Sequence, residues 1–306
     1  MPLFSVIVPF LNEAEVIAPT LESIRTQTCA DWEAIFVDDG SQDGTAQMVA
    51  AAAAADSRIR LIRHPGRGPS AARNAAAVVA TGTYLSFCDA DDIWAPERLA
   101  ELAAAFAQSD ADGLYGQIGF FRQTPADSRT VSTVHDAPLT VPVLLAENPV
   151  CTMSNLTVGR HAFLAAGGLD TGVVHNEDLE FLVRFVGKGA CIRSVDSLQV
   201  WYRASPTGLS SDLPAMRAGR ENALRTARRF GYAPDPSAEA AYLRYLARRA
   251  LRIDSGAFDP ARFTLQGLRC SARGFLFPLC RGGMTALAAF AAPVLPRRTR
   301  HFLFSN

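Results

Sequence analysis

Lysine is almost absent from this chain of 306 residues, and cysteine is rare and scattered. Lys188 is the only lysine, so nearly all of the positive charge is carried by arginine. The six cysteines form no close pair of the kind that binds zinc or carries a redox disulfide. These absences exclude a disulfide scaffold, and we expect reduced cysteines in the core of a cytoplasmic protein.

Long apolar runs and glycine-rich phosphate loops are missing as well. The N-terminal apolar run has no basic segment before it and no small-residue cleavage site, which disfavours a signal peptide. The longest charge-free apolar stretch near the C-terminus, residues 282–296, has 15 residues and is short for a membrane span. Residues 66–74 match neither the P-loop nor the dinucleotide-binding pattern, and no histidine spacing suggests zinc.

Charge is balanced over the whole chain but unevenly distributed along it. Residues 1–216 carry 14 basic and 25 acidic side chains, a net charge of −11. Residues 217–306 carry 16 basic and 5 acidic side chains, a net charge of +11. This asymmetry predicts two domains with different tasks: a large domain over 1–216 and a basic, mostly helical extension over 217–306.

Short β-branched runs alternate with helical patterns in the first hundred residues. We expect strands at 4–8, 33–37, 59–63 and 83–88, and helices at about 16–24, 45–55, 70–80 and 96–106. The first strand should stop at Pro9, because proline cannot donate to a sheet. Farther on, 113–121 is predicted as a strand and 123–136 as a loop. The alternation predicts an α/β fold with a doubly wound, mostly parallel sheet, followed by a C-terminal α-helical extension.

Polar, mostly acidic side chains follow three of the predicted strands. They are Asn12–Glu13, Asp38–Asp39 and the group Asp89, Asp91 and Asp92. Ligands of doubly wound sheets bind at the carboxyl ends of the strands, so these groups should converge on one rim. An Asp-x-Asp pair can share a divalent cation whose other positions take phosphate oxygens and water. The alternative is a turn and helix start in which Asp92 and Pro96 serve local capping.

The loop after the second strand also admits two interpretations. One carboxylate of Asp38–Asp39 can face a pocket and accept a bond from a ring N–H or a ribose hydroxyl. Alternatively, residues 38–45 form an ordinary loop whose Asp43 or Thr45 caps the next helix.

Taken together, these motifs resemble those of family 2 glycosyltransferases. Order and spacing agree over about residues 3–205. The resemblance is carried by Ser5–Pro9 with Asn12–Glu13, Gln27–Thr28, Asp38–Ser41, Gly68–Asn74, Asp89–Asp92, Gly167–Asp170 and Glu177–Asp178. It implies a GT-A catalytic domain over 1–216 that moves a sugar, with inversion, from a nucleoside-diphosphate sugar to a hydroxyl acceptor. The donor in this family is usually a UDP-sugar.

The resemblance also implies roles for the residues that bind the donor nucleotide. Asp39 would hold the uracil ring, and Arg73 would lie beside the base or the diphosphate. Asp89 would contact the ribose or the water of a metal ion. The loop residues that would line the nucleoside are Pro9, Phe10, Asn12 and Glu13.

For the chemical step, Asp178 matches the catalytic base of the family and Asp91 its ligand for Mg²⁺ or Mn²⁺. A cation there would neutralise the charge that develops on the leaving diphosphate, so one base suffices. The alternative for Asp178 is helix capping, because residues 176–178 all suit a first turn.

Three accessory residues have open assignments. Glu177 would orient the acceptor. Arg203 is either a diphosphate clamp or a surface arginine. Trp94 either stacks on a sugar ring or packs in the core or a lid.

The basic extension contains apolar segments bracketed by arginines. Residues 274–280 and 282–296 are apolar, and arginines lie before, between and after them. Such a pattern suits an anionic membrane leaflet. The alternative is a helical subdomain that buries the apolar residues. Nucleic-acid binding is disfavoured, because no recognised binding module accompanies the charge.

The sequence thus predicts a metal-dependent inverting glycosyltransferase, cytoplasmic and peripheral at the inner face of the plasma membrane. Its acceptor would be a glycan or lipid-linked precursor of the cell envelope or an exopolysaccharide. One rival is a non-catalytic nucleotide-sugar-binding protein of the same fold. Another is a sugar nucleotidyltransferase, which would need a glycine-rich loop with a basic residue near the N-terminus, and residues 9–14 lack it.

Overall fold

The computed structural model describes residues 1–204 and 212–304. The chain divides into two compact units. The first consists of residues 1–139 and 149–205, and the second of residues 140–148 and 206–306.

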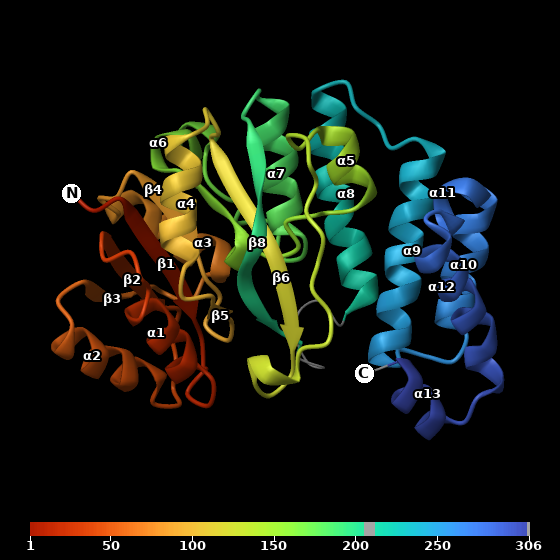
Figure 1. The fold of residues 1–306 in the computed structure, drawn as a ribbon, viewed down its shortest axis with the longest axis horizontal. Helices are drawn as coiled ribbons and strands as arrows, with labels where there is room; N and C mark the ends of the chain where they lie inside the picture. Colours follow the sequence, from red (N-terminus) through yellow and green to blue (C-terminus); the bar gives the residue numbers. More distant parts are fainter. Residues whose placement is uncertain (205–211, 305–306) are drawn as a thin grey trace. The chain divides into compact units, whose positions relative to one another are not determined.

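The first unit is an eight-stranded sheet, over the described residues, with helices on both faces (Figure 1). The strands are β1 (Phe4–Phe10), β2 (Trp32–Asp38), β3 (Ile59–Arg63), β4 (Tyr84–Phe87), β5 (Ile93–Trp94), β6 (Gly113–Phe121), β7 (Thr157–Gly159) and β8 (Ile192–Arg203). The helices are α1 (Ile17–Arg25), α2 (Thr45–Ala55), α3 (Pro69–Val79), α4 (Arg98–Ala107), α6 (Arg160–Ala166) and α7 (Glu177–Gly187). All five strands predicted above are present in the sheet.

The sheet order is β3-β2-β1-β4-β7-β6-β8-β5. Strands β1 to β4 pair in parallel, as do β6 and β8. The short β7 runs antiparallel to both β4 and β6, and β5 pairs antiparallel with β8. The prediction of a doubly wound, mostly parallel sheet is therefore confirmed.

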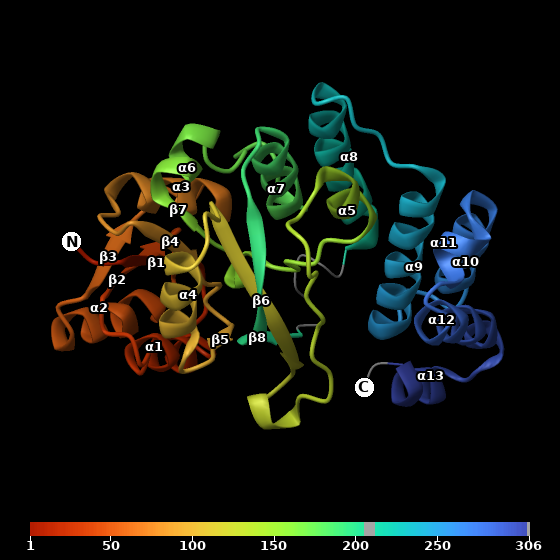
Figure 2. The same ribbon diagram turned by 45° about the horizontal axis from the view of Figure 1, so that its top comes forward.

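Helices cover the two faces of the sheet because alternate strand residues point to opposite sides. Phe4, Val6 and Val8 of β1 belong to a core cluster shared with α1, α2 and α4. On the other face, the rings of Phe163 and Phe181 lie 5.1 Å apart between α6 and α7. Figure 2 shows α1 and α2 on one side of β1–β3 and α3 and α6 on the other. With both faces covered, the loops at the strand ends remain for ligand binding.

Strand β1 runs through Pro9 to Phe10, so the predicted stop at Pro9 is wrong. The carbonyl of Ile7 accepts a bond from Cys88 N, just after β4, at 3.0 Å. The nitrogen of Pro9, two residues later, faces the same neighbouring strand. Strand β4 has ended by this point, so no donor is needed there. On the other side, Asp39 N donates to Phe10 O at 3.0 Å and keeps the strand paired.

The second unit is helical, as predicted for the C-terminal part. Its helices are α5 (Val141–Ala146), α8 (Leu213–Arg229), α9 (Pro236–Ile253), α10 (Asp259–Cys270), α11 (Ala272–Leu276), α12 (Leu279–Ala291) and α13 (Arg297–Phe304). Leu243, Leu246, Phe263 and Phe275 form part of its apolar core. Within the described ranges, no helix is both long and apolar enough to cross a membrane.

Helix α5 belongs to the second unit although it lies in the middle of the sequence. Leu145 is buried, and its carbonyl accepts a bond from Arg220 Nη2 at 3.0 Å. The Glu147 carboxylate lies 3.8 Å from Arg244 Nη2 and 3.5 Å from Arg281 Nη1.

These contacts correct the predicted division at residue 216. That position falls inside α8, and residues 140–148 pack with the second unit. Charge distribution along the chain could not reveal this, because α5 is a short apolar helix inside the acidic part of the sequence.

Candidate functional site

The loops that follow β1, β2 and β4 leave the same edge of the sheet, because these neighbouring strands are parallel. Hydrogen bonds join the first two loops. Asn12 N donates to Ser41 Oγ at 3.1 Å, and Asn12 Oδ1 accepts from Gln42 N at 2.8 Å. Glu13 N donates to Thr45 Oγ1 at 2.9 Å. The predicted rim is therefore a connected structure, and Asn12 is one of the residues that tie it together.

Asp39, the predicted uracil contact, is buried at the end of β2 and already has three partners. The Nδ1 atom of His64 lies 2.7 Å from Asp39 Oδ1. The backbone N–H groups of Arg67 and Gly68 donate to the two carboxylate oxygens at 3.1 and 2.8 Å. A carboxylate has about four acceptor positions, and these partners from the described residues occupy three of them.

His64 is a site residue that sequence reasoning missed. Its spacing from the other histidines indicates no zinc site, and none of the motifs includes it. A usable signal exists, because His64 directly follows β3, the same strand-end position that singled out the acidic residues.

Arg73 joins two acidic residues from opposite parts of the chain. It lies in α3 and is buried. Its Nη2 atom lies 2.5 Å from Asp89 Oδ1, and its Nη1 atom lies 3.3 Å from Glu177 Oε1. Burial opposes the charged form, but the two carboxylates raise the pKa of Arg73 above its usual value. This bridge links the loop after β4 to the first turn of α7.

The Asp89 carboxylate is also held from its other side. Thr152 Oγ1 donates to Asp89 Oδ2 at 3.1 Å, and Asp89 N donates to Ser154 Oγ at 2.8 Å. Both partners lie in or next to a short 3₁₀ turn, Met153–Asn155, for which the sequence provided no motif. Both oxygens of Asp89 are therefore engaged by the protein, so its orientation is well defined.

Asp91 lies among other carboxylates of the rim. Burial, followed by the Asp89 carboxylate, raises the pKa of Asp91 to about 6. Burial and the Asp91, Asp43 and Asp89 carboxylates raise the pKa of Glu13 to about 7. Crowded, partly buried carboxylates are stabilised by a cation between them and their ligand.

The residues present fit a divalent ion that takes only one or two carboxylates from the protein. Across residues 1–204 and 212–304, no group of three His, Cys, Asp or Glu side chains has the arrangement of a metal site. Mg²⁺ commonly takes one or two protein carboxylates and fills its remaining positions with phosphate oxygens and water. Asp91 is the side chain that would hold such an ion.

Asp178 and Glu177 form the first turn of α7. Burial, followed by the Glu177 carboxylate, raises the pKa of Asp178 to about 7. Burial also raises the pKa of Glu177, although Arg73 opposes that effect. A carboxylate whose pKa lies near neutrality has the proton affinity that a general base needs.

Arg203 lies beside the Asp91 loop. Its Nε atom donates to Asp91 O and its backbone N donates to Asp92 Oδ1, both at 2.9 Å. Its Nη1 atom donates to the carbonyls of Arg122 and Gln123 at 3.2 and 3.3 Å. It is therefore more than a surface arginine, because it fixes the backbone of the predicted metal ligand. The Asp92 carboxylate thus accepts from a residue 111 positions away in the chain and not from the start of α4, whose N-cap, Glu97, makes no side-chain cap bond, so the local-capping alternative for Asp92 is wrong.

Two predicted contacts are not available to a ligand. Trp94 is 2% exposed, its Nε1 atom donates to Ser154 O at 3.2 Å, and the Arg98 guanidinium covers its ring. The sugar-stacking alternative is therefore wrong, and Trp94 packs in the core. The side chain of Phe10 is also buried in the core, so only its backbone lies at the rim. Both residues come from strand ends whose side chains point inward.

Asn74 of the Gly68–Asn74 motif and Arg184 of α7 have structural roles. The side-chain amide of Asn74 pairs with the backbone of Leu169, accepting from its N–H and donating to its carbonyl, each at 2.8 Å. Arg184 Nη1 and Nη2 donate to the carbonyls of Ala166 and Gly168 at 2.7 Å. These bonds hold the Gly167–Asp170 turn against α3 and thereby place the segment that leads into Asp178.

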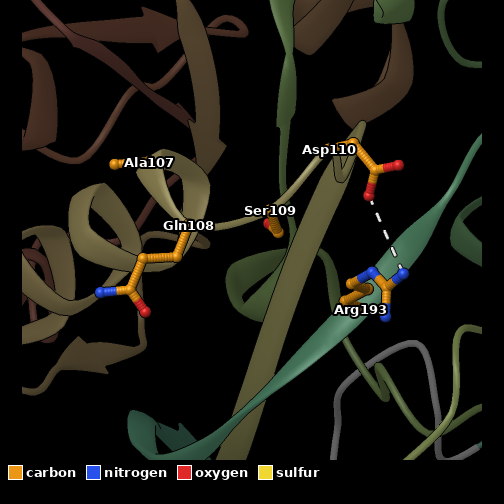
Figure 3. Close-up of a pocket in the computed structure, with 5 residues that line it drawn as sticks. All are labelled: Ala107, Gln108, Ser109, Asp110 and Arg193. Atoms are coloured by element: carbon orange, nitrogen blue, oxygen red, sulfur yellow. Dashed lines mark ion pairs between the residues drawn. The ribbon is translucent and has the colours of Figure 1, made fainter.

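The pocket in Figure 3 lies away from this rim. It has a volume of about 690 Å³ and is lined by Ala107, Gln108, Ser109, Asp110 and Arg193. Asp110 and Arg193 form an exposed ion pair at 3.8 Å. Both residues lie at the amino ends of β6 and β8, whereas the acidic rim lies at the carboxyl ends of β1, β2 and β4. We therefore place the candidate active site at the rim.

Comparison with known proteins agrees with this choice. The sequence profile of the family described as "Glycosyl transferase family 2" matches residues 5–163. The uncharacterized glycosyltransferase EpsJ of Bacillus subtilis is 34% identical over 157 residues, which are 51% of this chain and 42% of EpsJ. An Escherichia coli enzyme, UDP-Glc:alpha-D-GlcNAc-diphosphoundecaprenol beta-1,3-glucosyltransferase WfgD, is 34% identical over 115 residues, 37% of this chain and 45% of the enzyme. These matches span less than half the length of either relative.

Among solved structures, residues 1–349 of S. aureus TarS align with a TM-score of 0.59 at 18% identity, covering 99% of this chain and 88% of that one. The same TarS segment in complex with UDP-GlcNAc gives a TM-score of 0.59 at 16% identity, covering 99% and 89%. At this identity the likeness shows the fold, and it confirms the predicted GT-A class with a helical C-terminal part.

Proposed function

Because this chain belongs to glycosyl transferase family 2, we propose that its rim transfers a sugar from a UDP-sugar to a hydroxyl acceptor with inversion of the anomeric carbon. The observation that carries the proposal is the Arg73 bridge. It joins Asp89, beside the candidate cation ligand, to Glu177, beside the candidate base. One site therefore combines a place for the diphosphate with a group that can accept a proton.

The donor nucleotide would lie along the loops after β1 and β2. Asp39 would accept the imide N–H of the uracil ring at its remaining acceptor position. Asp89, held by Arg73 and Thr152, would contact the ribose or a water molecule bound to the metal ion. The name of WfgD specifies a UDP-sugar donor, and a TarS structure contains UDP-GlcNAc, which supports a UDP-sugar here.

For the chemistry, Asp178 would remove the proton of the acceptor hydroxyl as its oxygen attacks the anomeric carbon. Its raised pKa, about 7, makes it a stronger base than an ordinary aspartate. Glu177, held by Arg73, would orient the acceptor. A divalent ion at Asp91, Mg²⁺ or Mn²⁺, would neutralise the charge that builds on the leaving diphosphate.

The acceptor we propose is a glycan or lipid-linked precursor of the cell envelope or an exopolysaccharide, reached at the inner face of the plasma membrane. The lipid-linked acceptor in the name of WfgD supports this class. The assignment places the protein in the cytoplasm with a peripheral membrane contact.

The test is release of UDP from a panel of UDP-sugars, with Asp91→Ala and Asp178→Ala as the site variants. We expect each variant to lower turnover by about 10²–10⁴-fold. Asp110→Ala is the matched control, because Asp110 is an exposed carboxylate at the other edge of the sheet. Full turnover by Asp178→Ala would contradict the base assignment. Binding of UDP-sugars without any turnover by the unmodified chain would favour the non-catalytic rival.

A further inference from the structure

Helix α12 and the turn after it expose a row of large apolar side chains. Met284, Leu287, Phe290 and Val294 are 64%, 68%, 46% and 82% exposed. The three-residue spacing of Met284, Leu287 and Phe290 places them on one side of α12, and Val294 follows in the 3₁₀ turn Ala292–Val294. Just before them, Phe277 and Leu279 are 56% and 59% exposed. We refer to these six side chains as the α12 apolar face.

The other side of α12 is the one that packs within the second unit. Gly282, Thr285 and Ala289 are buried. A Cβ atom at Gly282 would overlap the backbone of Phe275 and Leu276 in α11, so this side of α12 lies directly against its neighbour. Small residues therefore face inward and large apolar residues face outward, which reverses the usual order of a helix in a globular protein.

The charge around this face has one sign. No Asp or Glu occurs after Asp259, whereas seven arginines do. Arg281 and Arg300 are partly buried ion-pair partners of Glu147 and Asp254. The exposed arginines are Arg262, Arg269, Arg273, Arg297 and Arg298, on α10, α11 and α13, and of these Arg297 also pairs with Asp254 at 3.2 Å.

Helices α10 and α11 pack against α12, and α13 follows it closely in the chain, as Figures 1 and 2 show. The exposed arginines therefore lie on helices that pack against α12 or follow it in the chain. Helix α10 repeats the combination on a smaller scale, with Phe258 and Leu265 exposed beside Arg262 and Arg269.

We propose that the α12 apolar face binds the surface of an anionic phospholipid bilayer, with α12 parallel to the membrane plane. The apolar side chains would enter the boundary between headgroups and acyl chains, and the arginines would contact lipid phosphates. A second copy of this chain is a poorer occupant, because it would bring two arginine-rich surfaces of the same charge together. The α12 apolar face would make the membrane contact proposed above, and it includes no residue of the catalytic rim.

The experiment is flotation of the full chain with vesicles of phosphatidylcholine alone or mixed with phosphatidylglycerol. We expect flotation with the mixed vesicles, little with phosphatidylcholine, and weaker flotation at high salt. The variant Leu287→Glu/Phe290→Glu should bind the mixed vesicles about tenfold less or worse, because two inserting side chains become anionic. Val78→Glu is the matched control, since Val78 is an exposed apolar residue on a helix of the first unit.

Thermal melting of each variant checks folding, and Met284→Ser/Leu287→Ser is a milder second variant that should also reduce flotation. UDP release in the absence of vesicles should be unchanged by these substitutions, which separates this proposal from the transferase assignment. Equal flotation of the unmodified chain and Leu287→Glu/Phe290→Glu would overturn the proposal. So would a dimer in solution that the same substitutions convert to monomers, because the face would then join two copies.

Discussion

Arg73 shows how one buried side chain organises this site. Its planar guanidinium presents two amino groups in a fixed geometry, and each bonds to a different carboxylate. A buried cation between two acids also lowers their mutual repulsion. The family resemblance assigned Arg73 to the base or diphosphate. The structure shows a second role, in which Arg73 fixes Asp89 and Glu177 relative to each other.

The raised pKa of Asp178 leads to a pH prediction. A general base acts in its deprotonated form, and the folded protein holds the proton of Asp178 up to about pH 7. We therefore expect kcat/KM for sugar transfer to rise with pH through about 7 and then to level off. The profile can be measured by UDP release, and an acid limb that is unchanged in Asp178→Glu would point to another base.

The same residue links function to stability. Because the folded-state pKa of Asp178 lies above that of an unfolded aspartate, its contribution to stability is present at low pH and is lost as pH rises through about 7. Asp178→Asn places no buried negative charge in the folded protein. We expect this substitution to raise the free energy of unfolding by about 1–3 kcal/mol at pH 8. Thermal melts at pH 5 and pH 8 should show a larger gain at pH 8, because stability falls over the whole interval between the unfolded-state pKa of 3.8 and the folded-state pKa of about 7, while sugar transfer is lost at both pH values.

His64 is expected to position Asp39 for the nucleotide. Its ring nitrogen lies 2.7 Å from the Asp39 carboxylate. His64→Leu should raise KM for the UDP-sugar by about tenfold with little change in kcat, because it removes one bond to a binding group and none to a reacting atom. His64→Asn, which keeps a donor, should recover part of the loss. A purely structural role would instead lower the melting temperature and kcat together.

At the scale of elements, the site depends on turns that orient its helices. The Gly167–Asp170 turn holds α6 and the approach to α7 through Asn74 and Arg184. Gly168 has φ +66° and a Cβ there would lie 2.6 Å from Asn74 Oδ1. The turn therefore needs glycine for both its backbone conformation and its packing.

We expect Gly168→Ala to lower the free energy of unfolding by about 2–4 kcal/mol, from backbone strain and the displaced Asn74. Gly159→Ala is the control, because a Cβ at Gly159 would meet its nearest neighbours at an ordinary 3.8 Å. Chemical denaturation of both variants measures the difference. Equal stability would mean that the Asn74 amide can move without cost.

At the scale of the whole molecule, the two units are interleaved in sequence. Residues 140–148 leave the first unit, pack in the second and return to the segment that holds Asp89. A truncation after residue 204 would expose the side chains of Val141, Leu144 and Leu145, which are buried in the full chain. We expect that truncated protein to aggregate during gel filtration. Replacing these three residues by serine in the truncated chain should restore a soluble protein. If both truncated forms are insoluble, the first unit depends on other contacts with residues 205–306 as well.

Sequence patterns predicted the parts of this protein that repeat locally. Alternation of β-branched runs with helical periodicity predicted the sheet, and the strand-end rule predicted an acidic rim around Asp39, Asp89 and Asp91. These signals depend on residues a few positions apart. The net charge of +11 over residues 217–306 likewise predicted a separate basic part.

Other features depend on contacts between residues far apart in the chain, and only the tertiary structure decided them. Arg73 and Glu177 are 104 positions apart, and Thr152 and Asp89 are 63 apart. Contacts of this long-range type also explain three other features. The side chains of Trp94 and Phe10 point into the core, α5 packs in the second unit, and α12 exposes its large apolar side chains. The sequence by itself determined which residues reach the rim, because strand ends follow from local periodicity. The fold decided which of them are held, buried or left exposed, because burial and pairing depend on what the rest of the chain brings beside them.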